Sequence, residues 1–165
     1  MNLQFYLEKL HASENFQNFI KKNPNAFLCS GFFVIDKVGN DNKQHFDFFI
    51  PSEKKIFSFQ LEEGIKLTPI DMLENAPIPE KLSLNYDFDF REIEKIINYE
   101  KQKYGVKDKI QKMLFSLQSK DGKDFLIGTI FVSALGMLKI NIDMSIKKVI
   151  LFEKKSFFDI LKRVK

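Results

Sequence analysis

Tryptophan is absent from this chain, and arginine nearly so. Only Arg91 and Arg163 are arginine, so lysine supplies almost all of the 26 basic residues. Arginine is the side chain that reads base edges and grips phosphates with two parallel hydrogen bonds. Its scarcity argues against a dedicated nucleic-acid-binding protein despite the net charge of +4. Because the lysines alternate with acidic residues, a solvated lysine-rich surface is the favoured interpretation, and nucleic acid is not the expected partner.

Cysteine and histidine are too few to build a metal centre. The chain has one cysteine, Cys29, and two histidines, His11 and His45. A single cysteine forms no internal disulfide, which fits a reducing compartment. Cys29 lies within the apolar run 26–35, where a buried structural thiol is favoured over a nucleophile. The sequence therefore assigns no metal ligand, no cofactor and no catalytic residue.

Glycine motifs for catalysis are also missing. The seven glycines are scattered singly, so phosphate-binding loops, dinucleotide fingerprints and nucleophile elbows are excluded. One carboxylate pair, Asp87 and Asp89, has the spacing of one strand face, about 7 Å, which is compatible with acid–base chemistry or cation binding. A solvated face combined with a helix cap explains the pair without catalysis. We therefore expect a protein that is not an enzyme.

No apolar run approaches the roughly 18 residues that a membrane helix needs. Even 125–142 is interrupted by glycine, serine and lysine. Residues 1–10 mix charged with apolar side chains and lack the basic region and the small-residue cleavage site of a secretory signal. The expectation is a cytoplasmic protein with no membrane partner.

The first half predicts a helix followed by three strands. Leucine and phenylalanine recur every three or four residues over 3–22, with Ser13 interrupting or recapping the helix before Pro24. Strands are predicted at 26–35, 44–50 and 57–61, because apolar runs are separated there by turn-forming residues. The phenylalanines that alternate along the second and third strands, Phe46, Phe48, Phe57 and Phe59, are expected in the core or, alternatively, around a ligand cavity.

The second half again places a helix before a series of strands. After a connector at 62–81, perfect alternation over 82–90 gives the clearest predicted strand. Asp89 then caps a helix, with Glu92 completing a capping box and Gly105 ending it. Residues 106–118 fit either a helix or a strand; we favour a strand from about residue 110.

Three further strands and a short helix complete the prediction. The strands fall at 125–133, 138–142 and 149–153, and Ser156 caps the terminal helix with Asp159 in a capping-box position. The predicted fold class is α+β, in which two units of a helix plus antiparallel strands form a curved sheet packed against helices. We expect one compact domain over 1–165, with subunits 1–61 and 82–165 that are interpretable as a diverged repeat.

The second half resembles the PepSY and cystatin-like group of small α+β modules. The resemblance covers residues 86–153 and rests on the final hairpin, where Ile142, Asp143 and Val149 match the PepSY pattern and Lys147 replaces its glycine. It implies a non-enzymatic module, regulatory or peptide-associated, of a group often found outside the cytoplasm.

Three functional hypotheses follow. The leading one is a non-enzymatic cytoplasmic module that binds an unidentified protein and forms a homodimer through a sheet or helix face. The second is a carrier that holds a small apolar ligand in a phenylalanine-lined pocket. The third is a salt-sensitive nucleic-acid binder using the lysines within 101–112 and 147–165.

Overall fold

An eight-stranded antiparallel sheet forms the framework of this computed structural model, which describes residues 2–163 except the side chains of 157 and 160. The spatial order is β4-β3-β2-β1-β5-β6-β7-β8. The strands are β1 Phe27–Asp36, β2 Lys43–Ile50, β3 Lys55–Gln60, β4 Lys66–Ile70, β5 Ile110–Lys120, β6 Lys123–Val132, β7 Gly136–Asp143 and β8 Lys148–Ser156. The helices are α1 Leu3–His11, α2 Glu14–Lys22, α3 Phe90–Lys103 and α4 Phe157–Arg163.

The two halves of the chain meet at the centre of the sheet. β1 pairs with β5 in antiparallel register, from Ser30 opposite Gln118 to Asp36 opposite Lys112. On each side of this pair, the remaining three strands of a four-stranded meander run outward to an edge. α1 and α2 precede the first meander, and α3 precedes the second. The α+β class and the curved sheet packed against helices are confirmed; a diverged repeat remains a prediction.

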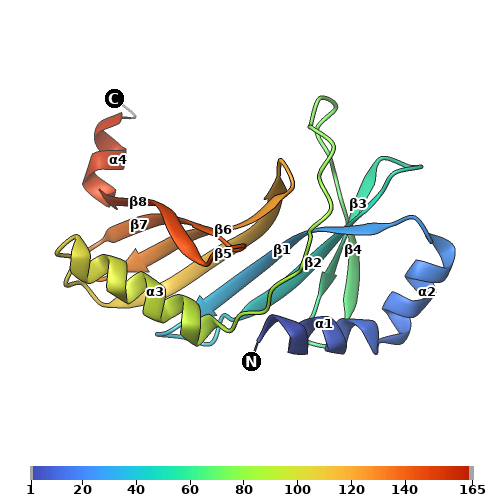
Figure 1. Cartoon of the computed structure of the whole chain (residues 1–165), viewed down its shortest axis with the longest axis horizontal. Coiled ribbons are helices and arrows are strands. Elements are labelled where there is room, and N and C mark those ends of the chain that lie inside the picture. The colour runs from blue at the N-terminus through green and yellow to red at the C-terminus, as the bar shows by residue number, and fades with distance from the viewer. Residues whose placement is uncertain (1, 164–165) are drawn as a thin grey trace.

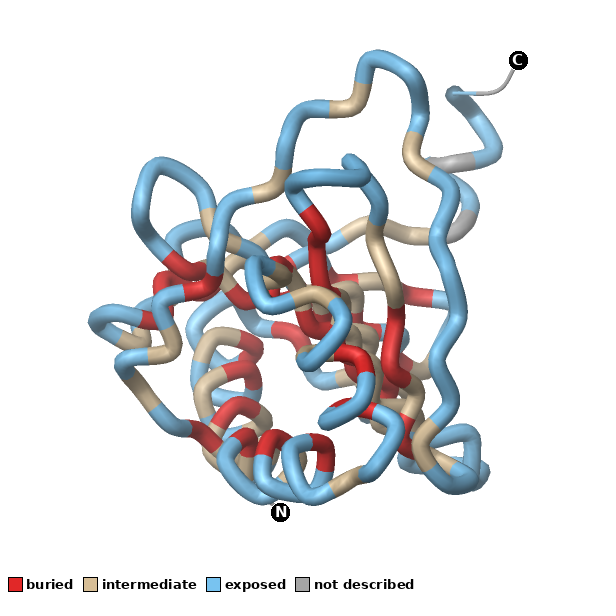
Figure 2. The backbone as a smooth tube through the Cα atoms, turned by 90° about the vertical axis from the view of Figure 1, so that its right-hand side faces the viewer, coloured by how far each residue is buried: buried red, intermediate tan, exposed pale blue. Residues whose placement is uncertain are grey.

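Three helices cover one face of the sheet. Figure 1 shows α1, α2 and α3 on one side, which we call the helix face, whereas α4 rises on the other side, the open face. A linking segment, residues 71–89, also rises above the open face before it crosses to the helix face and reaches α3 (Figure 1). The buried residues, red in Figure 2, gather on the strands and on the helix sides that face them.

The N-terminal half has an aromatic core. Phe59 is fully buried and its ring lies against those of Phe16, Phe19 and Phe48, with centroids 5.4, 5.1 and 5.6 Å away. Several of these pairs meet edge to face, which is the favoured geometry for aromatic rings. Phenylalanine therefore fills the space between α2 and β1–β3.

The C-terminal half has an aliphatic core. Its helix-face residues on β6 to β7 are fully buried: Leu126, Ile130, Leu138, Ile140 and Ile142. They pack in one core with Ile93 and Ile97 of α3. At Gly128, a Cβ would lie 2.6 Å from the Cγ2 of Ile140, so this close packing needs glycine.

The predicted strand 82–90 is wrong. Within residues 2–163, the segment has no strand partner and makes only one isolated bridge, between Asn2 and Asp89. It still alternates in burial, with Leu82 and Phe88 buried and Ser83 exposed, because its apolar side chains join the core while the others face solvent. Alternation in sequence thus shows that one side of the chain is buried and the other is exposed to solvent. An extended segment that lies along the core also has these two sides, although it does not belong to the sheet.

The predicted connector 62–81 contains a strand that sequence reasoning missed. β4 pairs with β3 from Lys66 opposite Gln60 to Ile70 opposite Ile56. It is an edge strand whose five residues are all exposed, and this is where Pro69 is tolerated. Because β4 has no buried face, its sequence carries no alternation of apolar and polar residues that would identify it as a strand.

The predicted helix boundaries are largely confirmed. Ser13 caps α2, and the Asp89 carboxylate caps α3 by accepting from the amides of Arg91 and Glu92. Glu92 does not complete that capping box, because its carboxylate binds Lys147 at 2.9 Å. The Ser156 and Asp159 pair does form a reciprocal box at α4. The ambiguous segment is a strand from residue 110, as favoured.

Candidate functional site

An apolar patch lies on the open face of the C-terminal half. Side chains alternate along β6, so Leu126 and Ile130 enter the core while Ile127 and Phe131 face the opposite side. Ile127 is 41% exposed and Phe131 is 40% exposed. The register carries the patch across β7 to β8, where Asn141 separates Ile127 from Leu151. We define the open-face patch by these residues and their neighbours: Phe125, Ile127, Phe131, Met137, Ile150 and Leu151.

Polar side chains of β7 interrupt the open-face patch. Lys139 lies between Thr129 and Glu153 in register, and Asn141 lies two residues further along β7. The Oδ1 of Asn141 is buried and has no hydrogen-bond partner among the described residues. Aromatic and aliphatic residues around a few polar groups are typical of surfaces that bind other proteins.

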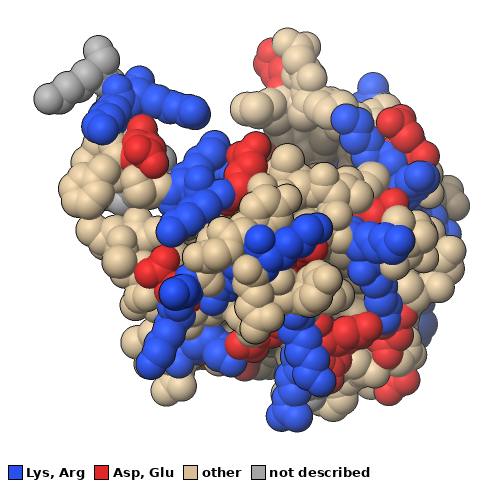
Figure 3. All heavy atoms as spheres, turned by 60° about the vertical axis from the view of Figure 1, so that its left-hand side comes forward, with Lys and Arg blue, Asp and Glu red and all other residues tan. Residues whose placement is uncertain are grey.

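A basic hollow adjoins the open-face patch beneath α4. Its volume is about 870 Å³, and its lining is Met137, Lys139, Glu153, Lys154, Lys155, Asp159 and Arg163. Four lining residues are cations and two are anions. Lys155 pairs with Glu153 at 3.7 Å, whereas Lys139 has no ion-pair partner within residues 2–163. Figure 3 shows basic side chains crowding this side of the molecule, which therefore favours an acidic partner.

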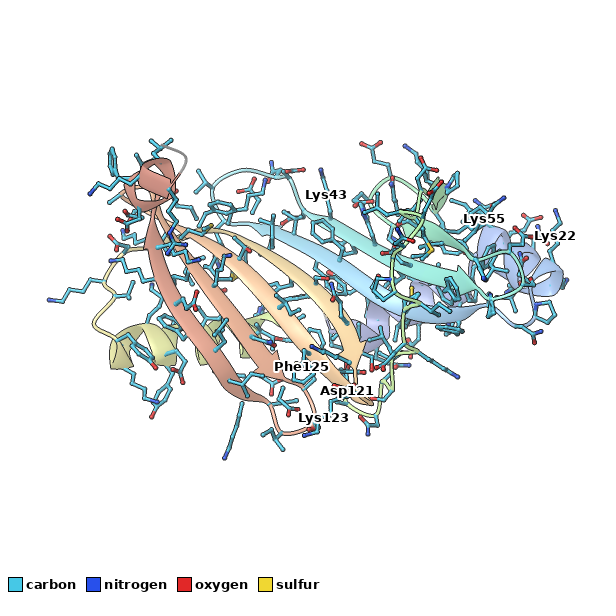
Figure 4. All side chains as sticks on the ribbon, turned by 90° about the horizontal axis from the view of Figure 1, so that it is seen from above. Lys22, Lys43, Lys55, Asp121, Lys123 and Phe125 are labelled. Carbon is cyan, nitrogen blue, oxygen red and sulfur yellow. The ribbon has the colours of Figure 1, made fainter. Side chains whose placement is uncertain are left out.

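The open face of the N-terminal half combines polar side chains with apolar ones that are covered, such as Val34 and Phe49, which are 4% and 2% exposed. The Ser30 hydroxyl donates to the Asp47 carboxylate at 2.7 Å, and His45 lies 2.6 Å from Glu62. The other carboxylate oxygen of Asp47 is buried without a partner in the described part of the chain. Figure 4, which views the open face, shows the linking segment crossing in front of β1 and β2. This half therefore offers less uncovered apolar surface than the open-face patch.

Cys29 is the buried thiol that the sequence predicts. It lies at a bulge of β1, and its Sγ donates to the Asp47 carbonyl at 3.3 Å. Burial raises the pKa of the Cys29 thiol to about 12, and the negative charge of Asp47 adds to the rise. A thiol with such a pKa carries little thiolate near neutral pH, which does not suit a nucleophile.

The carboxylate pair Asp87 and Asp89 is occupied by structural bonds. Asp87 accepts from the Asn2 side chain at 2.6 Å and from the Gln4 amide at 3.2 Å. Asp89 caps α3, and its amide bonds hold the pKa of this carboxyl below its usual value. The pair thus fastens the starts of two helices, as the cap interpretation predicts for Asp89.

The four phenylalanines of β2 and β3 fill the core. Phe46, Phe48 and Phe59 are buried, and their rings contact other aromatic rings. Phe57 is partly exposed and lines a surface hollow between α2, β3 and β4. Three of the four rings therefore belong to the core, and only Phe57 borders a hollow.

Several lysines of the two lysine-rich segments form ion pairs with acidic residues, which neutralise part of the positive charge. Lys112 lies 2.7 Å from Asp41, Lys147 lies 2.9 Å from Glu92, and Lys154 lies 3.4 Å from Asp108. Lys101 is buried and donates to the carbonyl of Asp108. Lys165 lies outside the described residues. These ion pairs interrupt the cationic surface that a nucleic-acid backbone would need, as far as residues 2–163 are concerned.

Within residues 2–163, no three histidine, cysteine or acidic side chains come together in a way that would hold a metal ion. Over the same residues, no helix combines the length and the apolar character needed to cross a bilayer.

One solved structure supplies a comparison for the fold. A putative lipoprotein from Clostridium difficile 630 is similar with a TM-score of 0.58 and 15% sequence identity, covering 86% of this chain and 91% of that chain. At this identity the similarity shows the fold alone. No protein-family model and no curated protein matches the sequence. The resemblance to PepSY and cystatin-like modules therefore remains a prediction.

Sequence reasoning did not identify the open-face patch. The signal was present in 125–132, where apolar residues occupy both faces of a strand with little polar alternation. Such a run is typical of a strand covered on both sides. In this sheet only one side of β6 is covered by a helix, so the second apolar face is left at the surface.

Proposed function

We propose that this chain is a non-enzymatic binding protein that holds a partner protein against its open-face patch. The observation that carries the proposal is the exposure of Ile127 and Phe131 on the open face, opposite the side that α1, α2 and α3 cover. Exposed apolar surface of this kind on a folded protein marks interaction sites.

The partner's contacting surface is apolar and net acidic. The apolar part matches Ile127 and Phe131, which lie on the same face of β6, four residues apart, and act as anchors. The acidic part matches the hollow beneath α4, where cations outnumber anions and Lys139 has no ion-pair partner within residues 2–163. Charge complementarity of this kind directs encounter and orientation, while apolar anchors supply most of the affinity.

A crosslinking experiment identifies the partner and tests the patch. A photo-crosslinking amino acid replaces Phe131 in the producing cells, and the protein it captures is purified for binding measurements. The double variant Ile127→Ser with Phe131→Ser should weaken binding on the order of 10³-fold, because each of the two anchors contributes about 2 kcal/mol. Lys139→Glu should weaken it further by charge reversal.

Phe5→Ser is the matched control, since Phe5 is 44% exposed but projects from α1 on the helix side. It should leave the dissociation constant unchanged. Equal binding of the purified partner by the wild type and the double variant would refute the proposal. A small-molecule adduct in native mass spectra of gently purified protein would instead support the carrier hypothesis.

We also propose a cytoplasmic location, which rests on the sequence. The fold neighbour is described as a lipoprotein, and that description applies to the neighbour. Fractionation of the producing cells, with the chain detected by antibody, separates a cytoplasmic from a membrane-attached protein.

A further inference from the structure

The two edges of the sheet are unequal. β4 is five residues long and contains Pro69, which removes one backbone donor. β8 is nine residues long, contains no proline and is the last strand of the sheet. An uncovered edge of this length presents a row of backbone donors and acceptors to any second strand.

The sequence of β8 is complementary to itself. Its first six residues are Lys-Val-Ile-Leu-Phe-Glu, residues 148–153. Against a second copy running in the opposite direction, Lys148 lies opposite Glu153, Val149 opposite Phe152, and Ile150 opposite Leu151. We propose that β8 pairs with β8 of a second copy in this register, so that two chains share one sixteen-stranded sheet. The inference does not depend on the proposed function of the open face.

The helix-face residues match in this register. Within the chain, Val149 lies opposite Ile142 and Phe152 lies opposite Ile140, and both Ile142 and Ile140 are buried on the helix face. Val149 and Phe152 are therefore also on the helix face, where each is partly buried against the core. The proposed pairing places these two residues next to each other twice, once on each side of the symmetry axis.

The open-face residues match as well. Lys148 lies opposite Asp143 and Glu153 lies opposite Lys139, which puts both on the open face. Ile150 is an extra residue where the register shifts, so it and Leu151 stand against Asn141. They are 55% and 43% exposed. Pairing would cover them and add two ion pairs between the chains.

Neighbouring registers match neither the helix-face residues nor the charges of the open face. A shift by one residue in either direction sets Val149 of the helix face against Leu151 or Glu153 of the open face. It also sets Lys148 against Phe152 or Lys154, and so removes its ion pair. Because a shift by one moves side chains to the wrong face, the bulge and the charges together select one register.

The flanking residues tolerate the pairing. Lys147 would approach Lys154 of the second copy, but each already has its own anion, Glu92 and Asp108. Ile146, exposed in the β7–β8 turn, would lie near the start of α4 in the second copy, where Phe158 is exposed. Two further exposed apolar residues thus fall at the ends of the interface.

Charge reversal tests the proposal by sedimentation velocity over a concentration series. The wild type should form a dimer. Lys148→Glu and Glu153→Lys should each weaken dimerisation by about 10-fold to 100-fold, because each change makes two cross-strand pairs repulsive. The double variant Lys148→Glu with Glu153→Lys should restore the dimer, since the charges are exchanged and attract again.

Lys66→Glu on the other edge is the matched control and should leave the dimer unchanged. Thermal unfolding of every variant, followed by circular dichroism, distinguishes a lost interface from a lost fold. A wild type that stays monomeric at millimolar concentration would overturn the inference, and so would a double variant no better than the single ones.

Discussion

The two halves of this protein share an order of elements but not a way of filling it. Between helices and sheet, the N-terminal half packs phenylalanine against phenylalanine, with Phe59 surrounded by three other rings. The C-terminal half packs isoleucine and leucine. Its Gly128 lies so close to Ile140 that a Cβ at position 128 would clash with the Cγ2 of Ile140. One framework of a helix before a four-stranded meander thus accepts two different packing chemistries, because volume and patterning matter more than residue type.

The open faces of the two halves differ in how much apolar surface they leave exposed. The N-terminal half places Ser30, His45 and Asp47 there, beside apolar residues such as Phe49 that are buried. The C-terminal half places Ile127 and Phe131 there. A sheet face needs apolar residues only where something covers it, so the half with the uncovered apolar face is where binding is expected.

The largest expected difference between the open faces is thiol reactivity. Native Cys29 should react with a thiol reagent at pH 8 roughly 10³-fold more slowly than a cysteine in the variant Cys29→Ser with Ile127→Cys, because burial suppresses its thiolate. Reaction rates followed by mass spectrometry measure the ratio, and both proteins should react alike in urea. Similar native rates would show that Cys29 is accessible.

Core truncation tests the contrast between the helix faces. Phe59→Ala should lower the free energy of unfolding by about 4 kcal/mol and Ile140→Ala by about 3 kcal/mol, because the ring leaves the larger cavity. Urea unfolding measures both, and Phe5→Ala, at an exposed site, should change it by less than about 0.5 kcal/mol. A greater loss at Ile140 would mean that the aliphatic half is the better packed one.

Much of this fold follows from local patterns. Turn residues and alternation place the strands on either side of the loop 37–42 and of the turn at Asp121 and Gly122, and capping residues such as Ser13 and Asp89 fix where helices begin. These signals are local in sequence, so they survive without knowledge of the tertiary structure.

The failures occur where tertiary context decides. Residues 82–90 alternate as a strand does, yet the segment lies outside the sheet and packs its apolar side chains against the core. The open-face patch was missed for a similar reason, since the sequence of β6 does not state how many of its faces a helix covers. Both questions depend on which elements meet in space.

Asp124 fastens the linking segment to the C-terminal half. Its carboxylate, buried at the start of β6, accepts from the Ser83 amide at 3.0 Å, the Leu84 amide at 3.2 Å and the Tyr86 hydroxyl at 2.7 Å. Leu84 has a φ of 50°, a left-handed conformation that costs energy for a leucine and is held here by these bonds. The crossing point between the two faces therefore depends on one carboxylate.

Replacing that carboxylate tests whether the C-terminal half anchors the segment. Asp124→Asn should lower the free energy of unfolding by about 2 kcal/mol at pH 7, because hydrogen bonds to a charged group are lost. Burial raises the pKa of Asp124, but the bonds from Tyr86, Leu84 and Ser83 outweigh it and leave the pKa below its usual value. The stabilisation is therefore complete above the unfolded pKa of about 3.9 and is lost as the pH falls through the lower folded pKa.

Urea unfolding from pH 7 to pH 2 should show the free energy of unfolding of the wild type approaching that of Asp124→Asn only at the acid end. The control Asp121→Asn, in the adjacent turn, should stay within about 0.5 kcal/mol of the wild type throughout. A difference between wild type and Asp124→Asn that persists unchanged at pH 2 would mean that the asparagine is excluded by its shape and not by the loss of charge.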